Sequence, residues 1–159
     1  MTGTDAPVPR RARDKTVATW LAFVGGAFGW HRFYLHGWGD AWGWAHAIPT
    51  ALGLWGVERV LTYGQDDKLS WLLLPLLGLG LVVACLSAIV MALQPPERWN
   101  GRYNPHLPAD APAGRTGWLT VLAVVLALMV GATAFMAALA FSFQRYFEYQ
   151  VEQGLLLSQ

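Results

Sequence analysis

Two long stretches of the chain, residues 70–93 and 118–143, contain no charged residue. At 1.5 Å per residue, each would form a helix of roughly 35–40 Å, longer than the hydrocarbon core of a bilayer. Soluble domains carry about 25% charged residues. This chain carries 13% and is 55% hydrophobic. The two stretches therefore predict membrane-spanning helices, and we expect an all-α integral membrane protein.

The first apolar segment, residues 16–30, is too short to span a bilayer alone, since its helix would rise only about 22 Å. We therefore expect this helix to continue through the following HRFYL, which ends at Leu35. The glycines of HGWGD at residues 36–40 permit a tight bend. A second apolar helix is expected over residues 41–61, so residues 16–62 are predicted to form a tight helical hairpin.

Composition sets the remaining boundaries, and the expected fold has four transmembrane helices. We expect a flexible basic arm at 1–15, the hairpin at 16–62, two further membrane helices within 63–143 separated by a Pro-rich extramembrane loop at 94–117, and a C-terminal tail at 144–159. The second half of the loop, PADAPAG, has the composition of a linker. The aromatic cluster of the tail predicts that it begins on the membrane surface.

The distribution of basic residues predicts the orientation, because cytoplasmic loops are enriched in Lys and Arg. With four passes, seven basic residues lie on the face of the termini and four on the other face. They are Arg10, Arg11, Arg13, Lys15, Arg59, Lys68 and Arg145 against Arg32, Arg98, Arg102 and Arg115. Both termini are therefore expected in the cytoplasm. High Trp and low Lys usage favour a bacterial inner membrane, and a net charge of +1 argues against nucleic-acid binding.

Glycines in the first helix are candidates for helix packing. Gly25 and Gly29 have the GxxxG spacing, and Gly26 stands beside them. In lipid, such small residues allow two helix backbones to approach closely. The spacing predicts a contact face against the very next helix, although it also arises by chance in apolar segments.

Charged residues near the bend have several possible partners. The guanidinium of Arg32 could bind a lipid phosphate, satisfy the carbonyls at the end of the first helix, or pair with Asp40. Asp40 is also placed to cap the second helix. A hairpin centred near Leu35 would bring Glu58 to the face of Lys15. There we expect an ion pair or two separately solvated charges.

Three histidines, His31, His36 and His46, are the candidates for a metal or proton site. The five-residue step between the first two is poorer than i, i+4 for sharing one helix face. The alternative is that they hydrogen-bond headgroups, backbone carbonyls or water, and we expect no metal and no cofactor. The sequence has no Ser–His–Asp set of plausible spacing and no phosphate-binding glycine loop. We therefore expect no enzymatic activity.

Many residues between positions 15 and 60 follow one known pattern. It consists of a Lys before the first helix, a G-x-F-G-x-H-R-F-Y-L signature, and a Gly, a Trp and an acidic residue in the second helix. The matching residues are Lys15, Gly26, Phe28, Gly29, His31, Arg32, Phe33, Tyr34, Leu35, Gly53, Trp55 and Glu58. This block resembles the two-transmembrane-helix (TM-two) domain family. His36 stands where the family usually has Gly, and Glu58 where it usually has Asp.

The resemblance implies a membrane hairpin, but the biochemical role of that family is largely unassigned. We expect a non-enzymatic scaffold or partner-binding module, with the lipid bilayer and a membrane-protein partner or homo-oligomer as its contacts. The candidate residues for lipid or partner binding are His31, Arg32, Phe33, Tyr34 and Glu58. The alternative is a small transporter or channel whose polar path is built from the hairpin.

Overall fold

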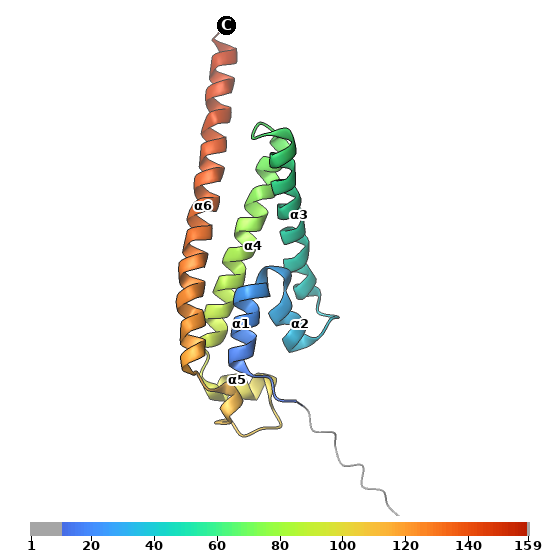
Figure 1. Cartoon of the computed structure of the whole chain (residues 1–159), viewed down its shortest axis with the longest axis vertical. Helices are drawn as coiled ribbons and strands as arrows, with labels where there is room; N and C mark the ends of the chain where they lie inside the picture. The colour runs from blue at the N-terminus through green and yellow to red at the C-terminus, as the bar shows by residue number, and fades with distance from the viewer. Residues whose placement is uncertain (1–10, 159) are drawn as a thin grey trace, which may run out of the picture.

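The computed structural model describes residues 11–158, and these residues form helices and loops without a strand (Figure 1). The elements are α1 (Lys15–Gly25), the 3-10 helix η1 (Gly26–Phe28), α2 (Trp30–His36), α3 (Ala41–Tyr63), α4 (Lys68–Ala92), α5 (Pro96–Tyr103), the 3-10 helix η2 (Pro112–Gly114) and α6 (Trp118–Leu157). Helices α4 and α6 are long and apolar enough to cross a membrane. The predicted all-α membrane fold is thus confirmed in outline, whereas the four spans are not.

Three long helices, α3, α4 and α6, form the body of the molecule, with α4 in the middle (Figure 1). Small residues set the close helix contacts. A Cβ added at Gly53 of α3 would lie 2.6 Å from Leu77 of α4, and one at Gly131 of α6 would lie 2.8 Å from Cys85 of α4. With its 23 residues, α3 rises about 35 Å. It therefore matches a bilayer in length, although it is less apolar than α4 and α6.

The first predicted membrane pass is not a single helix. Helix α1 ends at Gly25, and α2 runs back alongside it toward the foot of the bundle (Figure 1). The reversal occurs at Gly29, whose φ of 77° lies in the left-handed region that favours glycine. With 11 residues, α1 rises only about 16 Å, roughly half of a hydrocarbon core. The prediction of a continuous helix to Leu35 is therefore wrong, and α1–α2 forms a re-entrant hairpin.

This reversal changes where the ends of the chain lie. After the re-entrant hairpin, α3 rises, α4 descends and α6 rises again, so Lys15 and Leu157 lie at opposite ends of the bundle (Figure 1). The expectation that both termini share one face depended on four complete passes. The arrangement of the described residues does not support it.

The C-terminal residues continue the last helix instead of forming a separate tail. Helix α6 runs without a break for 40 residues, which is about 60 Å. It therefore projects beyond the loop that joins α3 to α4 (Figure 1). The predicted boundary at residue 143 is wrong because no Pro follows it and the first Gly comes only at Gly154.

The Pro-rich loop is a folded cap and not a plain linker. The side-chain amide of Asn100 in α5 donates to the carbonyls of Ala109 and Ala111, at 2.9 and 3.0 Å. The cap also holds the chain just before α1. Arg13 donates its N–H to Asn104 Oδ1 at 2.6 Å. Its carbonyl accepts from Trp99 Nε1 at 2.9 Å. This part of the predicted flexible arm is therefore fixed, and residues 1–10 lie outside the described residues.

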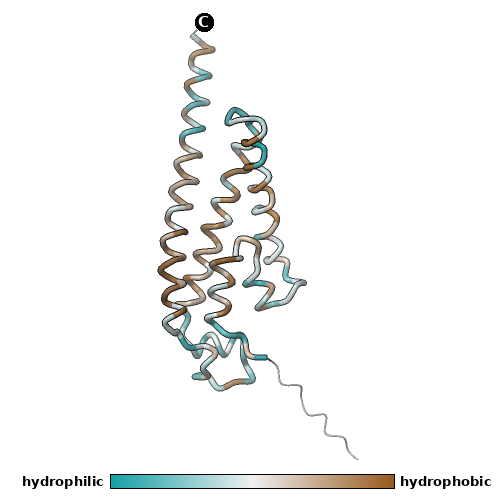
Figure 2. The backbone as a smooth tube through the Cα atoms, in the orientation of Figure 1, coloured by the Kyte–Doolittle hydropathy of each residue, from teal (hydrophilic) through white to brown (hydrophobic). Residues whose placement is uncertain are grey.

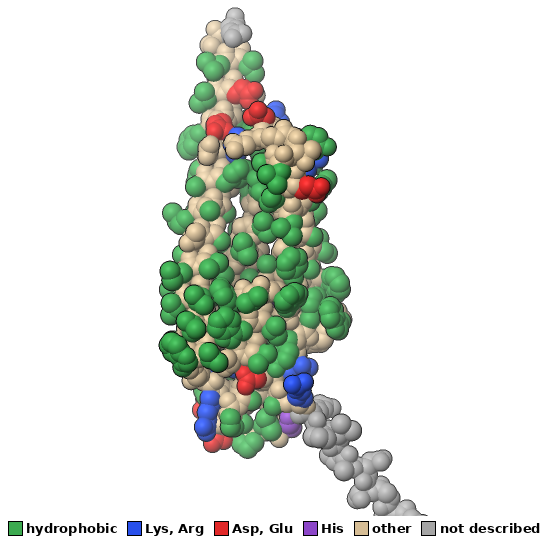
Figure 3. All heavy atoms as spheres, in the orientation of Figure 1, with side chains coloured by type: hydrophobic (Ala, Val, Ile, Leu, Met, Phe, Trp, Pro, Cys, Tyr) green, Lys and Arg blue, Asp and Glu red, His purple; other side chains and the backbone are tan. Residues whose placement is uncertain are grey.

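Hydropathy divides the molecule along its long axis. Figure 2 shows hydrophobic residues along the middle of the long helices and hydrophilic residues at the α5 end and at the α3–α4 loop. In Figure 3 the charged side chains gather near these same ends, with a broad apolar surface between them. Exposed leucines such as Leu72, Leu86 and Leu128 contribute to that surface. This distribution is the one expected for a helix bundle surrounded by lipid.

Candidate functional site in the re-entrant hairpin

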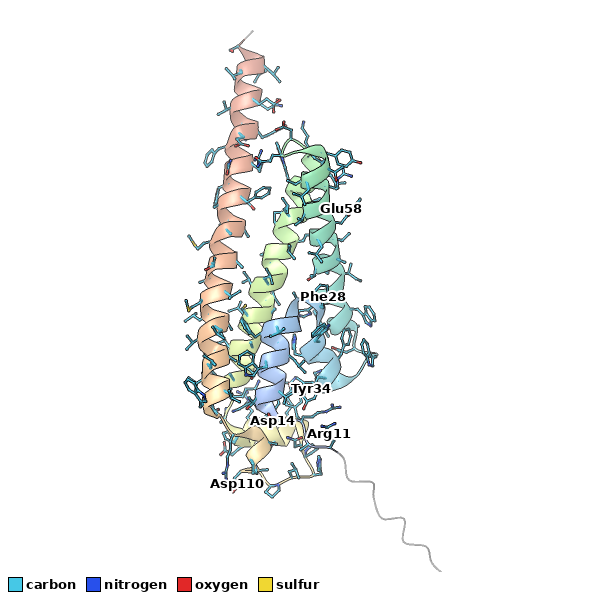
Figure 4. The ribbon with its side chains drawn as sticks, viewed as in Figure 1. Arg11, Asp14, Phe28, Tyr34, Glu58 and Asp110 are labelled. Carbon is cyan, nitrogen blue, oxygen red and sulfur yellow. The ribbon has the colours of Figure 1, made fainter. Side chains whose placement is uncertain are left out.

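The tip of the hairpin lies between α3 and α4, about midway along the bundle, where Figure 4 labels Phe28. The hydroxyl of Thr50 in α3 is within hydrogen-bond distance of two carbonyl oxygens, that of Ala27 at 2.6 Å and that of His46 at 2.9 Å. A Cβ added at Gly26 would lie 2.9 Å from Cβ of Ala84 in α4. The broken backbone of the tip is thus buried in protein, as irregular backbone at membrane depth requires.

The three candidate glycines each meet a different neighbour. Gly25 lies against the Trp30 ring, Gly26 against Ala84, and Gly29 against the carbonyl of Gly43 in α3. Of the three, Gly29 is the one whose nearest neighbour lies in the next long helix. The predicted common face of Gly25 and Gly29 does not form, because the helix ends between them.

Arg32 forms a bidentate ion pair with Asp40. Its Nε and Nη2 donate to the two carboxylate oxygens at 2.7 and 3.0 Å. The same carboxylate accepts from the N–H of Gly43 and so caps α3, as the sequence predicted. The Arg32 hydrogen bonds hold the pKa of Asp40 below its usual value. Of the three roles considered for Arg32, this structure shows the pairing with Asp40.

Two of the three histidines come together. His31 is 3% exposed, its Nδ1 has no hydrogen-bond partner, and its ring centroid lies 5.5 Å from that of His46. His36 is exposed and lies beside Tyr103 of α5, with centroids 6.0 Å apart. Within the described residues, no group of three His, Cys, Asp or Glu side chains is arranged to hold a metal ion.

The aromatic residues of the signature attach the hairpin turn to its surroundings. The Phe33 ring stacks on Trp38 with centroids 5.0 Å apart, and its centroid lies 5.4 Å from that of Trp44. The hydroxyl of Tyr34 accepts the backbone N–H of Asp14 at 3.1 Å. Both signature aromatics thus contact protein and are only partly exposed.

Lys15 is buried at the foot of α1 and joins three elements. Its Nζ donates to the carbonyl of Gln94 at 2.8 Å and to the hydroxyl of Thr116 at 2.7 Å. Because Gln94 follows the C-terminus of α4, the ammonium lies at the negative end of that helix. Glu58 is exposed toward the other end of α3 (Figure 4). The predicted Lys15–Glu58 pair is wrong, since the reversal brings residues 36–40 to the end of Lys15.

A second polar cluster, at the opposite end of the bundle, was not anticipated from the sequence. Arg59 donates to both carboxylate oxygens of Asp67, each at 2.8 Å, and Asp67 also caps α4 through the N–H of Ser70. These hydrogen bonds, that of Arg59 first, hold the pKa of Asp67 well below its usual range. Arg145 of α6 lies in the same region and is buried. In the sequence, the feature that could have indicated this cluster is that Arg145 is the first charged residue after the uncharged run 118–143.

Comparison with curated proteins and with solved structures gives no match. Comparison with family models gives one match, the TM2 domain, over residues 11–60. The matched segment comprises α1, η1, α2 and most of α3, so it contains the whole re-entrant hairpin and the helix that packs on its tip. The N-terminal segment of this chain is therefore a TM2 domain, and α4, α5 and α6 lie outside it.

Proposed function

We propose that this protein is a non-enzymatic membrane module that binds a helix of a partner membrane protein within the bilayer. The observation that carries the proposal is an apolar groove of about 310 Å³ between α4 and α6. Cys85 and Ile89 of α4 and Ala127, Gly131 and Ala132 of α6 are among its lining residues.

The chemistry of this groove suits another helix. Its lining is apolar, and Ala132 of α6 is both small and exposed, so another helix backbone can approach closely there, which is how helices associate in lipid. The surrounding surface, including Leu86 and Leu128, is apolar and exposed. A partner helix would therefore bury apolar side chains against small ones.

The polar groups of the TM2 domain support a structural role for the hairpin. Arg32 is engaged by Asp40, and Thr50 by the carbonyl of Ala27. Side chains that line a transport path must exchange partners with the substrate, whereas these are already engaged within the chain.

A transporter or channel is the second candidate, and one observation favours it. The hairpin ends inside the bundle and places the buried His31 ring beside His46. Broken helices at membrane depth and intramembrane ionisable residues are both typical of transport proteins.

We propose that the end of the molecule bearing α5 faces the cytoplasm, in a bacterial inner membrane. Among the described residues, seven basic residues lie toward that end and three lie toward the other. They are Arg11, Arg13, Lys15, Arg32, Arg98, Arg102 and Arg115 against Arg59, Lys68 and Arg145. This bias follows the positive-inside rule more strongly than the four-span arrangement does. In the proposed orientation, the C-terminal end of α6 lies outside the cytoplasm.

Filling the groove tests the proposal. Ala132→Phe should block it, whereas Thr133→Phe adds the same ring at an adjacent exposed position that does not line it. In-membrane cross-linking should recover a membrane-protein partner, or a second copy, with wild type and Thr133→Phe but not with Ala132→Phe. Equal recovery with both variants would exclude this groove as the binding site. Solute flux that depends on His31, with unchanged cross-linking, would favour the transport function.

A further inference from the structure

A second pocket, of about 340 Å³, lies where α4 begins and α6 leaves the bundle. It is at the opposite end of the molecule from α5. Its lining residues are Lys68, Trp71, Ser142, Arg145, Tyr146 and Tyr149. It therefore combines two cations with three aromatic rings, which distinguishes it from the apolar groove nearer the other end of the same two helices.

Arg145 is the most buried group in this pocket, with only 9% of its surface exposed. Its Nη1 pairs with Glu148 at 2.7 Å and its Nη2 donates to Gln65 at 2.8 Å, but its buried Nε has no partner. The guanidinium carbon lies 5.6 Å from the centre of the Trp71 ring. A guanidinium has five N–H donors, and a buried donor without a partner is costly. Arg145 is thus positioned by protein contacts while keeping donors unused.

Lys68 supplies a cation without a carboxylate partner. The two arginines at this end are both paired, Arg59 with Asp67 and Arg145 with Glu148. Among the residues that the structure describes, Lys68 forms no ion pair. Its ammonium is therefore available to an anion at the mouth of the pocket.

The position of the pocket points to a lipid and not to a water-soluble anion. Trp71, Tyr146 and Tyr149 are the residue types that occupy the headgroup level of a bilayer. One helical turn deeper along α4 and α6, an apolar groove of about 240 Å³ begins, with Leu74 and Phe141 among its lining residues. Phe141 also lies under the guanidinium of Arg145, at 5.7 Å. The cationic groups at headgroup level match the phosphate of a phospholipid, and the adjacent apolar groove matches its acyl chain.

We propose that this pocket binds a phospholipid with an ethanolamine headgroup. Its phosphate oxygens accept hydrogen bonds from Lys68 and from the unused donors of Arg145. Its ammonium lies against Glu148, whose side chain is 46% exposed and whose two carboxylate oxygens also accept from Gln144 and Arg145. An acyl chain follows the apolar groove along α4 and α6. The exposed carboxylate of Glu148 beside the two cations gives the ammonium of this headgroup a partner that an uncharged glycerol headgroup does not use.

Native mass spectrometry of the full-length, delipidated protein tests this site, with dioleoyl phosphatidylethanolamine and dioleoyl phosphatidylglycerol as the added probes. Wild type should retain the ethanolamine lipid preferentially. Lys68→Gln should reduce its retention about tenfold, as expected for loss of one charge-assisted hydrogen bond. Arg98→Gln, which removes an exposed charge at the α5 end, is the matched control and should leave retention unchanged.

Glu148→Gln provides the second test, because it removes the carboxylate from an exposed position and keeps the shape of the side chain. It should shift retention from the ethanolamine lipid toward the glycerol lipid. Equal retention of both lipids by wild type would overturn the headgroup assignment. Equal loss of lipid retention in Lys68→Gln and Arg98→Gln would show that the lipid does not bind in this pocket. Displacement of the lipid by millimolar inorganic phosphate would show that the pocket binds simple anions instead.

Discussion

The hydroxyl of Tyr34 lies 3.1 Å from the backbone nitrogen of Asp14, which joins the end of α2 to the start of α1 (Figure 4). A continuous helix would place these two residues about 30 Å apart, on opposite sides of a membrane. Their contact therefore defines the re-entrant path of the TM2 domain. It also brings residues 36–40, residues 11–14 and α5 to one end of the molecule.

Substitution of Gly29 tests the backbone reversal. Gly29→Ala should lower stability by at least about 1–2 kcal/mol, because its φ is positive and its Cβ would collide with the carbonyl of Gly43. Gly39→Ala is the control, since Gly39 has no positive φ and no neighbouring atom within 4 Å of an added Cβ. Thermal unfolding in detergent should show a clearly larger loss for Gly29→Ala. Equal losses would mean that the backbone does not reverse at Gly29.

The burial of Lys15 gives a prediction that separates its true partners from the expected one. Lys15→Met should destabilise the protein by about 1–3 kcal/mol, because the carbonyl of Gln94 and the hydroxyl of Thr116 lose a charged donor. Glu58→Gln should leave the melting temperature unchanged, since Glu58 is exposed and distant from Lys15. A large effect of Glu58→Gln that disappears in a Lys15→Met background would show that the two residues do form an ion pair.

A feature of this fold can be predicted from the sequence when the interacting residues lie close together along the chain. The long helices α4 and α6 follow from uncharged runs, and the capping of α3 by Asp40 follows from local spacing. Gly29 was recognised as important but was assigned to packing. A packing glycine and a glycine with a positive φ look the same in one sequence, and only the tertiary contact with Gly43 distinguishes them.

Other features depend on partners far along the chain. Lys15 is bonded to Gln94 and Thr116, and Arg145 to Gln65, across 79 to 101 residues. Periodicity and capping rules describe neighbours within a few residues, so they indicate no such partners. The linker composition of the loop likewise hides its folding around Asn100, whose two carbonyl acceptors become available only when the loop closes.

The Arg59–Asp67 pair predicts a pH dependence of stability. The pKa of Asp67 is lowered in the folded protein, so the unfolded state binds a proton first as the pH falls. The stabilisation is therefore complete above the ordinary aspartate pKa of about 4 and is lost progressively as the pH falls from there toward the lowered pKa of the folded state. The difference in melting temperature between wild type and Asp67→Asn should be smaller at pH 3 than at pH 7. A difference that stays constant over this range would contradict the pairing.

The most direct test of the re-entrant hairpin is the sidedness of three single cysteines in a Cys85→Ser background. Arg11→Cys and His36→Cys, both at exposed positions, should react with an impermeant thiol reagent from the same side of the membrane. Asp66→Cys, in the α3–α4 loop, should react from the other side. If Arg11→Cys and Asp66→Cys react together and His36→Cys reacts alone from the opposite side, residues 16–35 cross the membrane and the re-entrant account is wrong.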